Sequence, residues 1–223
     1  MSDLSRSVQD YLKAIYGLTR GGVATTTTAL AERLGFAPAS VTNMLQKLAA
    51  MQPPLVNYQK RQSVKLSPAG EQAALRILRR HRLLETFLVK VLGYSWDEVH
   101  EEADQLEHII TERFEERLAR FLDHPEFDPH GDPIPSKDLV LPQKELSSLT
   151  VMEPEQGGRI RRVLTSSTEV LRYFDEIGVR PGESMVLSSR DPFDSVFTVK
   201  VGDAQIEHSL GARLAGLIEI EIE

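Results

Sequence analysis

Four side chains of types that bind metal ions recur at helical spacing between residues 99 and 108. His100, Asp104, Glu107 and His108 occupy positions i, i+4, i+7 and i+8. On an α-helix, at about 100° per residue, they fall within an arc of about 100°. Two imidazoles and two carboxylates on one face are typical of a metal site. The alternative is a solvated helix face whose histidines are satisfied by neighbouring polar groups.

A second pair, on the preceding predicted helix, favours the metal hypothesis. His81 and Glu85 are four residues apart, so their side chains share one face of a helix. The same two chemical types therefore recur on consecutive helices. A metal ion bound by both helices explains this repetition better than a chance arrangement of polar residues does.

Two long helices are predicted to position these ligands. Ser67 is the expected N-cap of the first, and Gly93 is its expected end. The capping box Ser95-x-x-Glu98 then predicts the start of a second helix, from Trp96 to Leu122. Both sets of candidate ligands lie within these two segments.

The second predicted helix carries an apolar stripe that needs a covering surface. Its members are Val99, Ala103, Leu106, Ile110, Phe114, Leu118 and Phe121. A stripe of about seven turns is covered either by the rest of the same chain or by a second copy. We favour a two-fold dimer interface.

The N-terminal segment has the pattern of a helix-turn-helix. A helix is predicted from Ser5 to Arg20, ended by the glycines that follow. A short helix then ends at Leu34 and Gly35, and Pro38 begins another that runs to Met51. Two short helices around a glycine-containing turn are typical of this motif.

Side chains suited to DNA lie on the predicted outward face of this motif. The segments Leu55–Gln59 and Ser63–Leu66 alternate as strands and predict a hairpin with a basic tip, so the whole unit is a winged helix. Small, hydrogen-bonding and basic residues without an acid suit the major groove, although they also suit an ordinary polar surface. The predicted DNA contacts are Thr27, Pro38, Ser40, Thr42, Asn43, Gln46, Lys47, Lys60 and Arg61.

The composition is that of a globular protein with unevenly distributed charge. The 223 residues are 41% hydrophobic and include no cysteine, which excludes disulfides and thiolate metal sites. The sequence has neither an apolar run of about 18 residues nor a signal-peptide core, so we expect a cytoplasmic protein. Residues 1–82 hold 12 Lys/Arg against 4 Asp/Glu, whereas the remainder holds 14 against 29. The basic part suits a polyanion, and the acidic part suits cations.

The C-terminal third is predicted to be a small β domain. A Pro-rich loop covers residues 127–135, and residues 136–149 have the pattern of a linker. A short helix is predicted at Thr168–Ile177. Strands are predicted at Arg159–Leu164, Met185–Ser188, Val196–Val201, Ala204–His208 and Leu217–Ile222. Five short strands in this length indicate an SH3-like barrel.

The order of these motifs resembles a known family along the whole chain. A winged helix is followed by His81-x-x-x-Glu85, by His100-x-x-x-Asp104-x-x-Glu107-His108, by the loop Pro-His-Gly-Asp-Pro-Ile-Pro and by a small barrel. This order is similar to the metal-dependent repressors of the diphtheria toxin repressor, iron-dependent regulator and manganese transport regulator family. We therefore predict a mainly α fold with a small β part. Its expected parts are a winged helix-turn-helix DNA-binding domain (1–72), a helical metal-binding and dimerisation domain (73–137), a linker (138–149) and an SH3-like, FeoA-like barrel (150–223).

The resemblance also implies two metal sites in each subunit. The family's primary site falls at Asp10, Asp104, Glu107 and His108. Its ancillary site falls at His81, Glu85 and His100, with Glu169 as a candidate ligand from the third domain.

Three positions bear on the choice of metal. The iron-sensing members have Met where Asp10 stands and Cys where Asp104 stands. Carboxylates in place of sulfur favour harder ions, so we predict Mn(II). The short manganese-sensing members have Glu where this chain has Lys13. A cation at that point argues against their closely spaced pair of metal ions.

These expectations combine into a transcriptional repressor that senses manganese and controls genes of metal-ion homeostasis. The cation would link the DNA-binding domain to the dimer helices and fix the spacing of two reading heads on a palindromic operator. An Fe(II)-sensing repressor of the same family is the nearest alternative, and a DNA-binding scaffold with structural metals is another. A helical two-metal enzyme is the alternative from a different class, but the sequence lacks its Glu-x-x-His pairs and a His-Glu-x-x-His motif.

Overall fold

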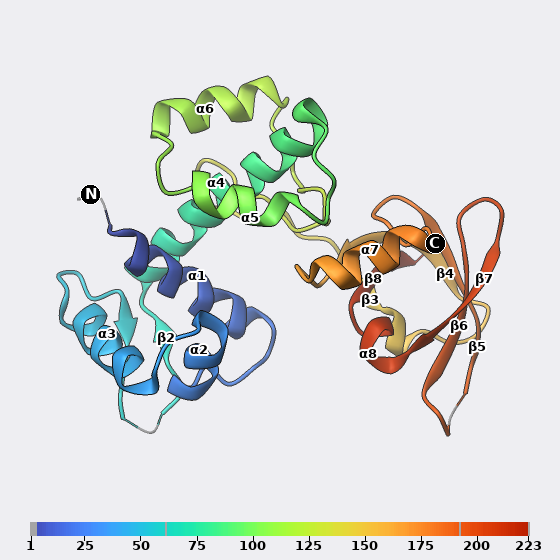
Figure 1. Cartoon of the computed structure of the whole chain (residues 1–223), viewed down its shortest axis with the longest axis horizontal. Coiled ribbons are helices and arrows are strands. Elements are labelled where there is room, and N and C mark those ends of the chain that lie inside the picture. Colours follow the sequence, from blue (N-terminus) through green and yellow to red (C-terminus); the bar gives the residue numbers. More distant parts are fainter. Residues whose placement is uncertain (1–3, 61, 192, 223) are drawn as a thin grey trace.

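The computed structural model describes residues 4–60, 62–191 and 193–222, and it arranges them in three parts that follow one another along the chain (Figure 1). A helical part with a small hairpin comes first, a second helical part follows, and a β domain with the C-terminus lies beside the second part. Each part has its own buried apolar cluster. Among the described residues, no helix is long and apolar enough to cross a membrane.

The first part is the predicted winged helix-turn-helix. Its elements are α1 (Arg6–Arg20), α2 (Thr27–Leu34), α3 (Pro38–Ala50), β1 (Val56–Asn57) and β2 (Lys65–Leu66). The Thr26 hydroxyl caps α2, and Gly35 ends it with a φ of 70°. Val41, Leu45 and Leu48 of α3 are fully buried, as the apolar spacing predicted. The antiparallel hairpin is confirmed in shorter form, while Arg61 lies outside the described residues.

The second part is built on α4 (Pro68–Leu92), α5 (Val99–Leu106) and α6 (Glu112–Phe121). The Ser67 hydroxyl accepts a hydrogen bond from the backbone of Gly70 at 3.1 Å, which confirms the predicted cap of α4. The N-terminal half of α4 packs in the first apolar cluster and its C-terminal half packs in the second part's cluster. This one helix therefore joins the DNA-binding fold to the candidate metal ligands.

The prediction of one helix from Trp96 to Leu122 is wrong, because the chain breaks between α5 and α6. Residues 96–98 form a turn rather than a capping box, and residues 107–109 form another. The Thr111 hydroxyl then accepts a hydrogen bond from Phe114 at 3.2 Å and starts α6. Three consecutive β-branched residues, Ile109 to Thr111, lower helix propensity at this point. Glu107 and His108 consequently lie just beyond the end of α5.

The break divides the predicted apolar stripe. Val99, Ala103 and Leu118 are buried inside the second part of the same chain. Phe114 and Phe121, in contrast, are 47% and 67% exposed. Only the exposed portion is therefore available to a second copy.

The third part is an antiparallel six-stranded sheet in the order β3-β8-β4-β5-β6-β7. Its elements are β3 (Ser147–Ser148), a 3-10 turn η1 (Leu149–Val151), β4 (Gly157–Val163), α7 (Thr168–Glu176), β5 (Ser184–Arg190), β6 (Val196–Val201), β7 (Ile206–Gly211), α8 (Ala212–Ala215) and β8 (Ile218–Ile222). The five predicted strands and the helix are present with small shifts at their ends. Strand β3, inside the stretch predicted as a linker, was missed because two serines carry no strand pattern.

Trp96 attaches the third part to the second. Its side chain is 9% exposed and belongs to the apolar cluster of the β domain. Beside it, Arg172 of α7 donates to the Asp97 carboxylate at 2.7 Å, and the Thr168 hydroxyl donates to the Asp97 carbonyl at 3.2 Å. The turn before α5 is thus inserted into the β domain.

The loop over residues 128–133 forms a second attachment. The backbone N–H of Val163 in β4 donates to the His130 carbonyl at 2.9 Å. A Cβ on Gly131, which has a φ of 85°, would lie 1.8 Å from the Arg161 carbonyl oxygen. Only glycine allows so close an approach. The motif loop is therefore held against β4.

Candidate metal centre

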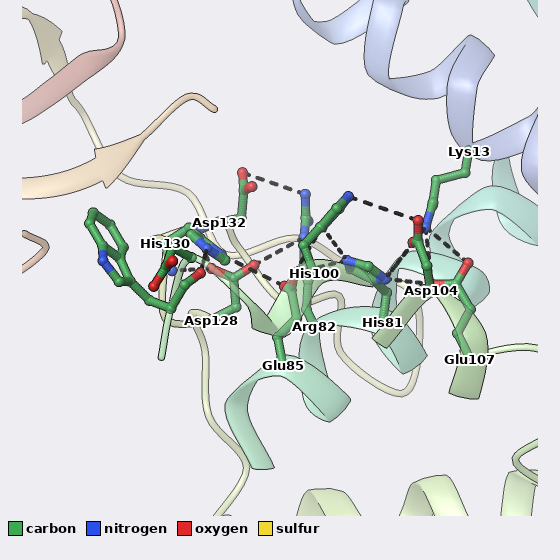
Figure 2. Close-up of polar contacts among 12 residues, drawn as sticks. Lys13, His81, Arg82, Glu85, His100, Asp104, Glu107, Asp128, His130 and Asp132 are labelled. Atoms are coloured by element: carbon green, nitrogen blue, oxygen red, sulfur yellow. Dashed lines mark hydrogen bonds and ion pairs between the residues drawn. The ribbon is translucent and has the colours of Figure 1, made fainter. Parts of the chain in front are cut away.

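A row of charged and imidazole side chains crosses the space between α1, α4, α5 and the loop at 128–132. Lys13 reaches into it from α1, while the other members come from the second part (Figure 2). The members of the row labelled in Figure 2 are Lys13, His81, Arg82, Glu85, His100, Asp104, Glu107, Asp128, His130 and Asp132. Glu107 belongs to the row from its place just beyond the end of α5, and its side chain is fully buried.

Three of the four predicted primary ligands meet where α1 faces the end of α5. Asp10, Glu107 and His108 each offer a ligand atom within 4.8 Å of the other two, and we call them the α1–α5 cluster. His108 Nε2 lies 3.2 Å from Asp10 Oδ1 and 3.7 Å from Glu107 Oε1. Burial raises the pKa of Asp10, although the nearby His108 opposes this. The cluster spans two parts of the chain.

Gln9 sets the tautomer of His108. The Gln9 amide nitrogen donates to the Leu4 carbonyl at 2.7 Å, which directs the amide oxygen toward His108. His108 Nδ1 lies 3.0 Å from that oxygen and must donate to it. The Nε2 lone pair is thereby left facing Asp10 and Glu107. A ligating histidine whose other nitrogen donates to a carbonyl is the usual arrangement in metal sites, and no sequence signal had indicated Gln9.

Asp104, the fourth predicted primary ligand, faces Lys13 instead. The Lys13 ammonium donates to Asp104 and lies 3.0 Å from both carboxylate oxygens of Glu107. Burial lowers the pKa of Lys13, but the carboxylates of Glu107 and Asp104 raise it by more. Burial conversely raises the pKa of Asp104, and the Lys13 ammonium lowers it below its usual range. Asp104 thus forms an ion pair with Lys13, and His81 Nδ1 lies 3.3 Å from the same carboxylate.

The three predicted ancillary ligands lie in direct contact. His81 Nε2 is 2.9 Å from Glu85 Oε1 and 3.0 Å from His100 Nδ1, and His100 Nδ1 is 3.1 Å from the same Glu85 oxygen. We call His81, Glu85 and His100 the histidine cluster. His81 Nδ1 also contacts Glu107 at 2.5 Å. Burial lowers the pKa of His81, but the Glu85 carboxylate and the bonds to Glu107 and Glu85 raise it to about 9.

A further cluster joins Glu85 to the motif loop. Glu85, Asp128 and His130 are all buried and offer ligand atoms within 4.8 Å of one another, and we call them the loop cluster. His130 Nε2 lies 2.7 Å from the Trp96 carbonyl, so it donates and leaves Nδ1 directed toward Glu85, 3.9 Å away. Burial raises the pKa of Asp128 well above its usual range, helped by the neighbouring carboxylates of Glu85 and Asp132. The His-Gly motif was noticed in the sequence, but these two residues were not predicted as ligands.

Glu169 does not join these clusters. It lies exposed in the first turn of α7. The metal-capable groups found among the described residues are the α1–α5 cluster, the loop cluster, and a group of His81, His100 and Asp104, and none of them contains Glu169. Its assignment as an ancillary ligand stays a prediction without a supporting contact.

The predicted DNA contacts lie mainly on exposed surface. Pro38, Ser40, Asn43, Gln46 and Lys47 are exposed along α3, and Lys60 is exposed at the hairpin. Thr42 is half-buried, and its hydroxyl donates to the Pro38 carbonyl at 3.0 Å. Thr27 is half-buried at the start of α2, and Arg61 is not among the described residues. The face of α3 is therefore free to meet a groove of DNA.

Family models match each of the three parts. Residues 3–64 match the iron dependent repressor, N-terminal DNA binding domain. Residues 67–136 match the iron dependent repressor, metal binding and dimerisation domain. Residues 147–222 match the FeoA domain.

Curated relatives and solved structures agree with these matches. The diphtheria toxin repressor of Corynebacterium diphtheriae is 32% identical over 201 residues, which cover 86% of this chain and 88% of that protein. The iron-dependent repressor IdeR of Mycobacterium leprae is 35% identical over 135 residues, 60% of this chain and 58% of that protein. The structure of a manganese-dependent transcriptional repressor in complex with manganese has a TM-score of 0.89 at 35% identity, covering 97% of this chain and 100% of that one. The manganese regulator SloR has a TM-score of 0.80 at 29% identity, with 97% and 98% covered.

These matches exclude the helical two-metal enzyme, because the family consists of transcriptional repressors. They leave the identity of the metal open, since iron-dependent relatives and manganese-dependent structures both occur among them. The winged helix, the clusters of metal-ligating side chains and the matches all lead to one conclusion: the chain belongs to the family of the diphtheria toxin repressor and the manganese-dependent regulators, and is a metal-dependent, DNA-binding transcriptional repressor.

Proposed function

We propose that this repressor senses Mn(II) and controls genes of metal-ion homeostasis. The observation that carries this proposal is the donor set of the α1–α5 cluster: carboxylates of Asp10 and Glu107 and one imidazole of His108, without sulfur. Oxygen and imidazole donors suit Mn(II), whereas thiolate and thioether donors select softer ions.

The primary ion would be held by Asp10, Glu107 and His108, with Asp104 as the fourth ligand. The Asp104 side chain is 41% exposed, so it has room to leave Lys13. Asp10 lies on α1, whose opposite face packs Leu12 in the DNA-binding core. When bound, the cation would supply an electrostatic link between that core and α5. The link would favour one orientation of the winged helix relative to α5 over others.

A second ion in each subunit is proposed at the histidine and loop clusters. Glu85 belongs to both, so one ion could draw on His81, His100, Asp128 and His130 around it. The fixed tautomer of His130 supports this assignment, because its free Nδ1 faces Glu85. Such an ion would lie beside the attachment of the β domain.

The partner is proposed to be palindromic double-stranded operator DNA, bound by a homodimer in the cytoplasm. The dimerisation-domain match and the exposed Ile109, Phe114 and Phe121 support a symmetric pair. Two α3 helices related by a two-fold axis would then read two half-sites about one helical turn apart.

The test is a DNA-binding titration with an operator selected from random DNA. The metal-free protein would be titrated separately with Mn(II), Fe(II), Co(II) and Zn(II), without oxygen, while fluorescence anisotropy reports binding. We expect Mn(II) to raise the affinity for operator by about 5- to 150-fold. Equal operator affinity with Mn(II) and with chelator would contradict a sensor and support a scaffold whose metals are structural.

Fe(II) is the second candidate metal, favoured by the iron-dependent relatives. The same titration decides between the two. Activation by Fe(II) at lower free concentration than Mn(II) would assign iron, and the reverse order would assign manganese.

A further inference from the structure

Lys13 is the one residue through which α1 touches both α4 and α5 within the row of Figure 2. Its ammonium donates to Asp104, lies 3.0 Å from Oε1 and Oε2 of Glu107, and lies 3.4 Å from Nδ1 of His81. An ammonium has three donors, and here it has neighbours for all of them. The side chain is 20% exposed, so most of it is buried.

The ammonium lies beside the α1–α5 cluster and shares Glu107 with it. Glu107 faces His108 of the α1–α5 cluster through Oε1, at 3.7 Å, and faces Lys13 through both oxygens. Its carboxylate is therefore shared between the α1–α5 cluster and the ammonium. Two-metal sites place their ions about 3.5–4 Å apart around such shared ligands. On the far side, His81, His100 and Asp104 form another group whose ligand atoms lie within 4.8 Å of one another.

Lys13 is one of two nitrogen groups that partner the carboxylates at this point. Glu107 is fully buried and Asp104 lies beside it, and His81 Nδ1 contacts them at 2.5 Å and 3.3 Å. Buried charges that lack a partner are strongly destabilising. Lys13 supplies the partner that comes from α1, so its ion pairs connect α1 to α5.

We infer that the Lys13 ammonium is a tethered cation, which clamps α1 to α4 and α5 before any metal binds and occupies the place of a second ion next to the α1–α5 cluster. This inference rests on the proposed function, because it assumes that the α1–α5 cluster binds Mn(II). Binding of Mn(II) would break one contact of this clamp, because Asp104 must leave Lys13 in order to bind the ion.

The first test counts bound ions. Lys13→Met keeps the length of the side chain and removes its charge. After equilibrium dialysis of the full chain against Mn(II), elemental analysis should find about one more ion per chain than in the wild type, because the ammonium no longer occupies the place beside Glu107, where an ion could share the neighbouring oxygen and imidazole donors. Lys13→Arg keeps the charge and should bind the wild-type number. Lys137→Met, which removes an exposed lysine paired with Glu116, is the matched control and should also bind that number.

The second test measures the clamp in metal-free protein. Hydrogen exchange of the α1 amides should be at least about tenfold faster in Lys13→Met than in the wild type or Lys137→Met. If Lys13→Met binds the same number of ions as the wild type, Lys13 does not exclude a second ion. If its α1 amides exchange at the wild-type rate, Lys13 does not clamp α1. Extra Mn(II) in Lys13→Arg would also contradict the inference, so the test holds even if the methionine variant does not fold. A wild-type chain that binds no Mn(II) overturns the proposed function as well, whereas normal binding with equal counts in all variants overturns this inference alone.

Discussion

Gln9 has no charge and is not among the predicted ligands, yet it prepares His108 for a metal ion. Its amide oxygen, oriented by a bond to the Leu4 carbonyl, holds the proton on Nδ1 of the imidazole. The lone pair of Nε2 is then directed at Asp10 and Glu107 without any rearrangement. This arrangement lowers the free-energy cost of binding a metal ion, because His108 is already in the tautomer that the ion requires.

Replacing Gln9 should therefore weaken metal binding although no ligand is lost. We expect Gln9→Met to lower the affinity for Mn(II) about 10- to 100-fold, measured by isothermal titration calorimetry. Gln105→Met, at an exposed position of α5, is the matched control. Equal affinities in both variants would show that Gln9 does not orient His108.

Asp10 is expected to determine which metals activate the repressor. Asp10→Met substitutes a soft thioether for a carboxylate, so DNA-binding activation should move from Mn(II) toward Fe(II) or Co(II). His108→Ala should abolish activation by all of these metals. The measurement is the operator titration with each metal in turn. If Asp10→Met leaves the order of activation unchanged, Asp10 is not a selectivity ligand and the manganese assignment loses its main support.

His81 should make the metal-free protein less stable at alkaline pH. Its pKa is raised from 6.5 to about 9 in the folded chain, so folding favours the protonated form. The resulting stability is fully present below about 6.5 and is lost as the pH rises through about 9, on the order of a few kcal/mol. The raised pKa of Asp128 acts in the same direction, beginning above the usual pKa of a carboxyl.

Urea unfolding in the presence of chelator at about pH 6 and about pH 9.5 measures this loss. His81→Gln should show a smaller difference between the two values. An equal difference in both proteins would assign the pH dependence to other groups.

At the scale of elements, the chain breaks between α5 and α6 where the sequence predicts one continuous helix. Amphipathic spacing continues through residues 99–121 and by itself predicts one helix. Propensity and capping act against it locally, since Ile109, Ile110 and Thr111 disfavour the helix and Thr111 caps the next one. The ligand row still assembles, because Glu107 and His108 stay within one turn of the end of α5.

The short helices and strands were more predictable than the contacts between them. Thr26, Gly35 and Ser67 are local signals that fix the ends of their helices. The contact of Asp128 and His130 with Glu85 joins residues more than 40 positions apart in sequence and has no local signal. The ion pair of Asp104 with Lys13 is likewise a tertiary contact, because it joins α5 to α1.

Mutations in α3 and in the β1–β2 hairpin should change DNA binding in different ways. Lys60→Ala should weaken binding to all DNA sequences alike and reduce the salt dependence by about one counterion. Asn43→Ala, on the exposed face of α3, should instead change sequence preference by about 1–3 kcal/mol at one base position. Competition binding against operator variants at several salt concentrations measures both. A wing variant without effect at any salt concentration would contradict the winged-helix interface.

At the scale of the whole molecule, the exposed apolar side chains of α6 and the preceding turn predict a dimer. Two chains of 25.0 kDa each should sediment as one species of about 50 kDa. Phe121→Glu should give a monomer, because a charge in an apolar interface is costly. Phe121 is 67% exposed in the single chain, so its replacement should leave the fold intact.

Val140→Glu is the control for this experiment, since Val140 is 64% exposed outside the helical part. It should sediment as the wild type does. A wild-type monomer that still binds a palindrome in the presence of metal would contradict the interface assignment.

The insertion of Trp96 into the β domain affects how shortened versions of this repressor must be interpreted. A chain cut after about residue 140 would expose the indole, and His130 would lose the β4 contact that holds its loop. The isolated β domain would in turn carry a gap in its core the size of a tryptophan side chain. Loss of repression on deleting the β domain would therefore report damage to the Glu85–Asp128–His130 cluster as much as the absence of the β domain itself. A point change at Arg172, which holds Asp97 from the surface of α7, separates the two effects.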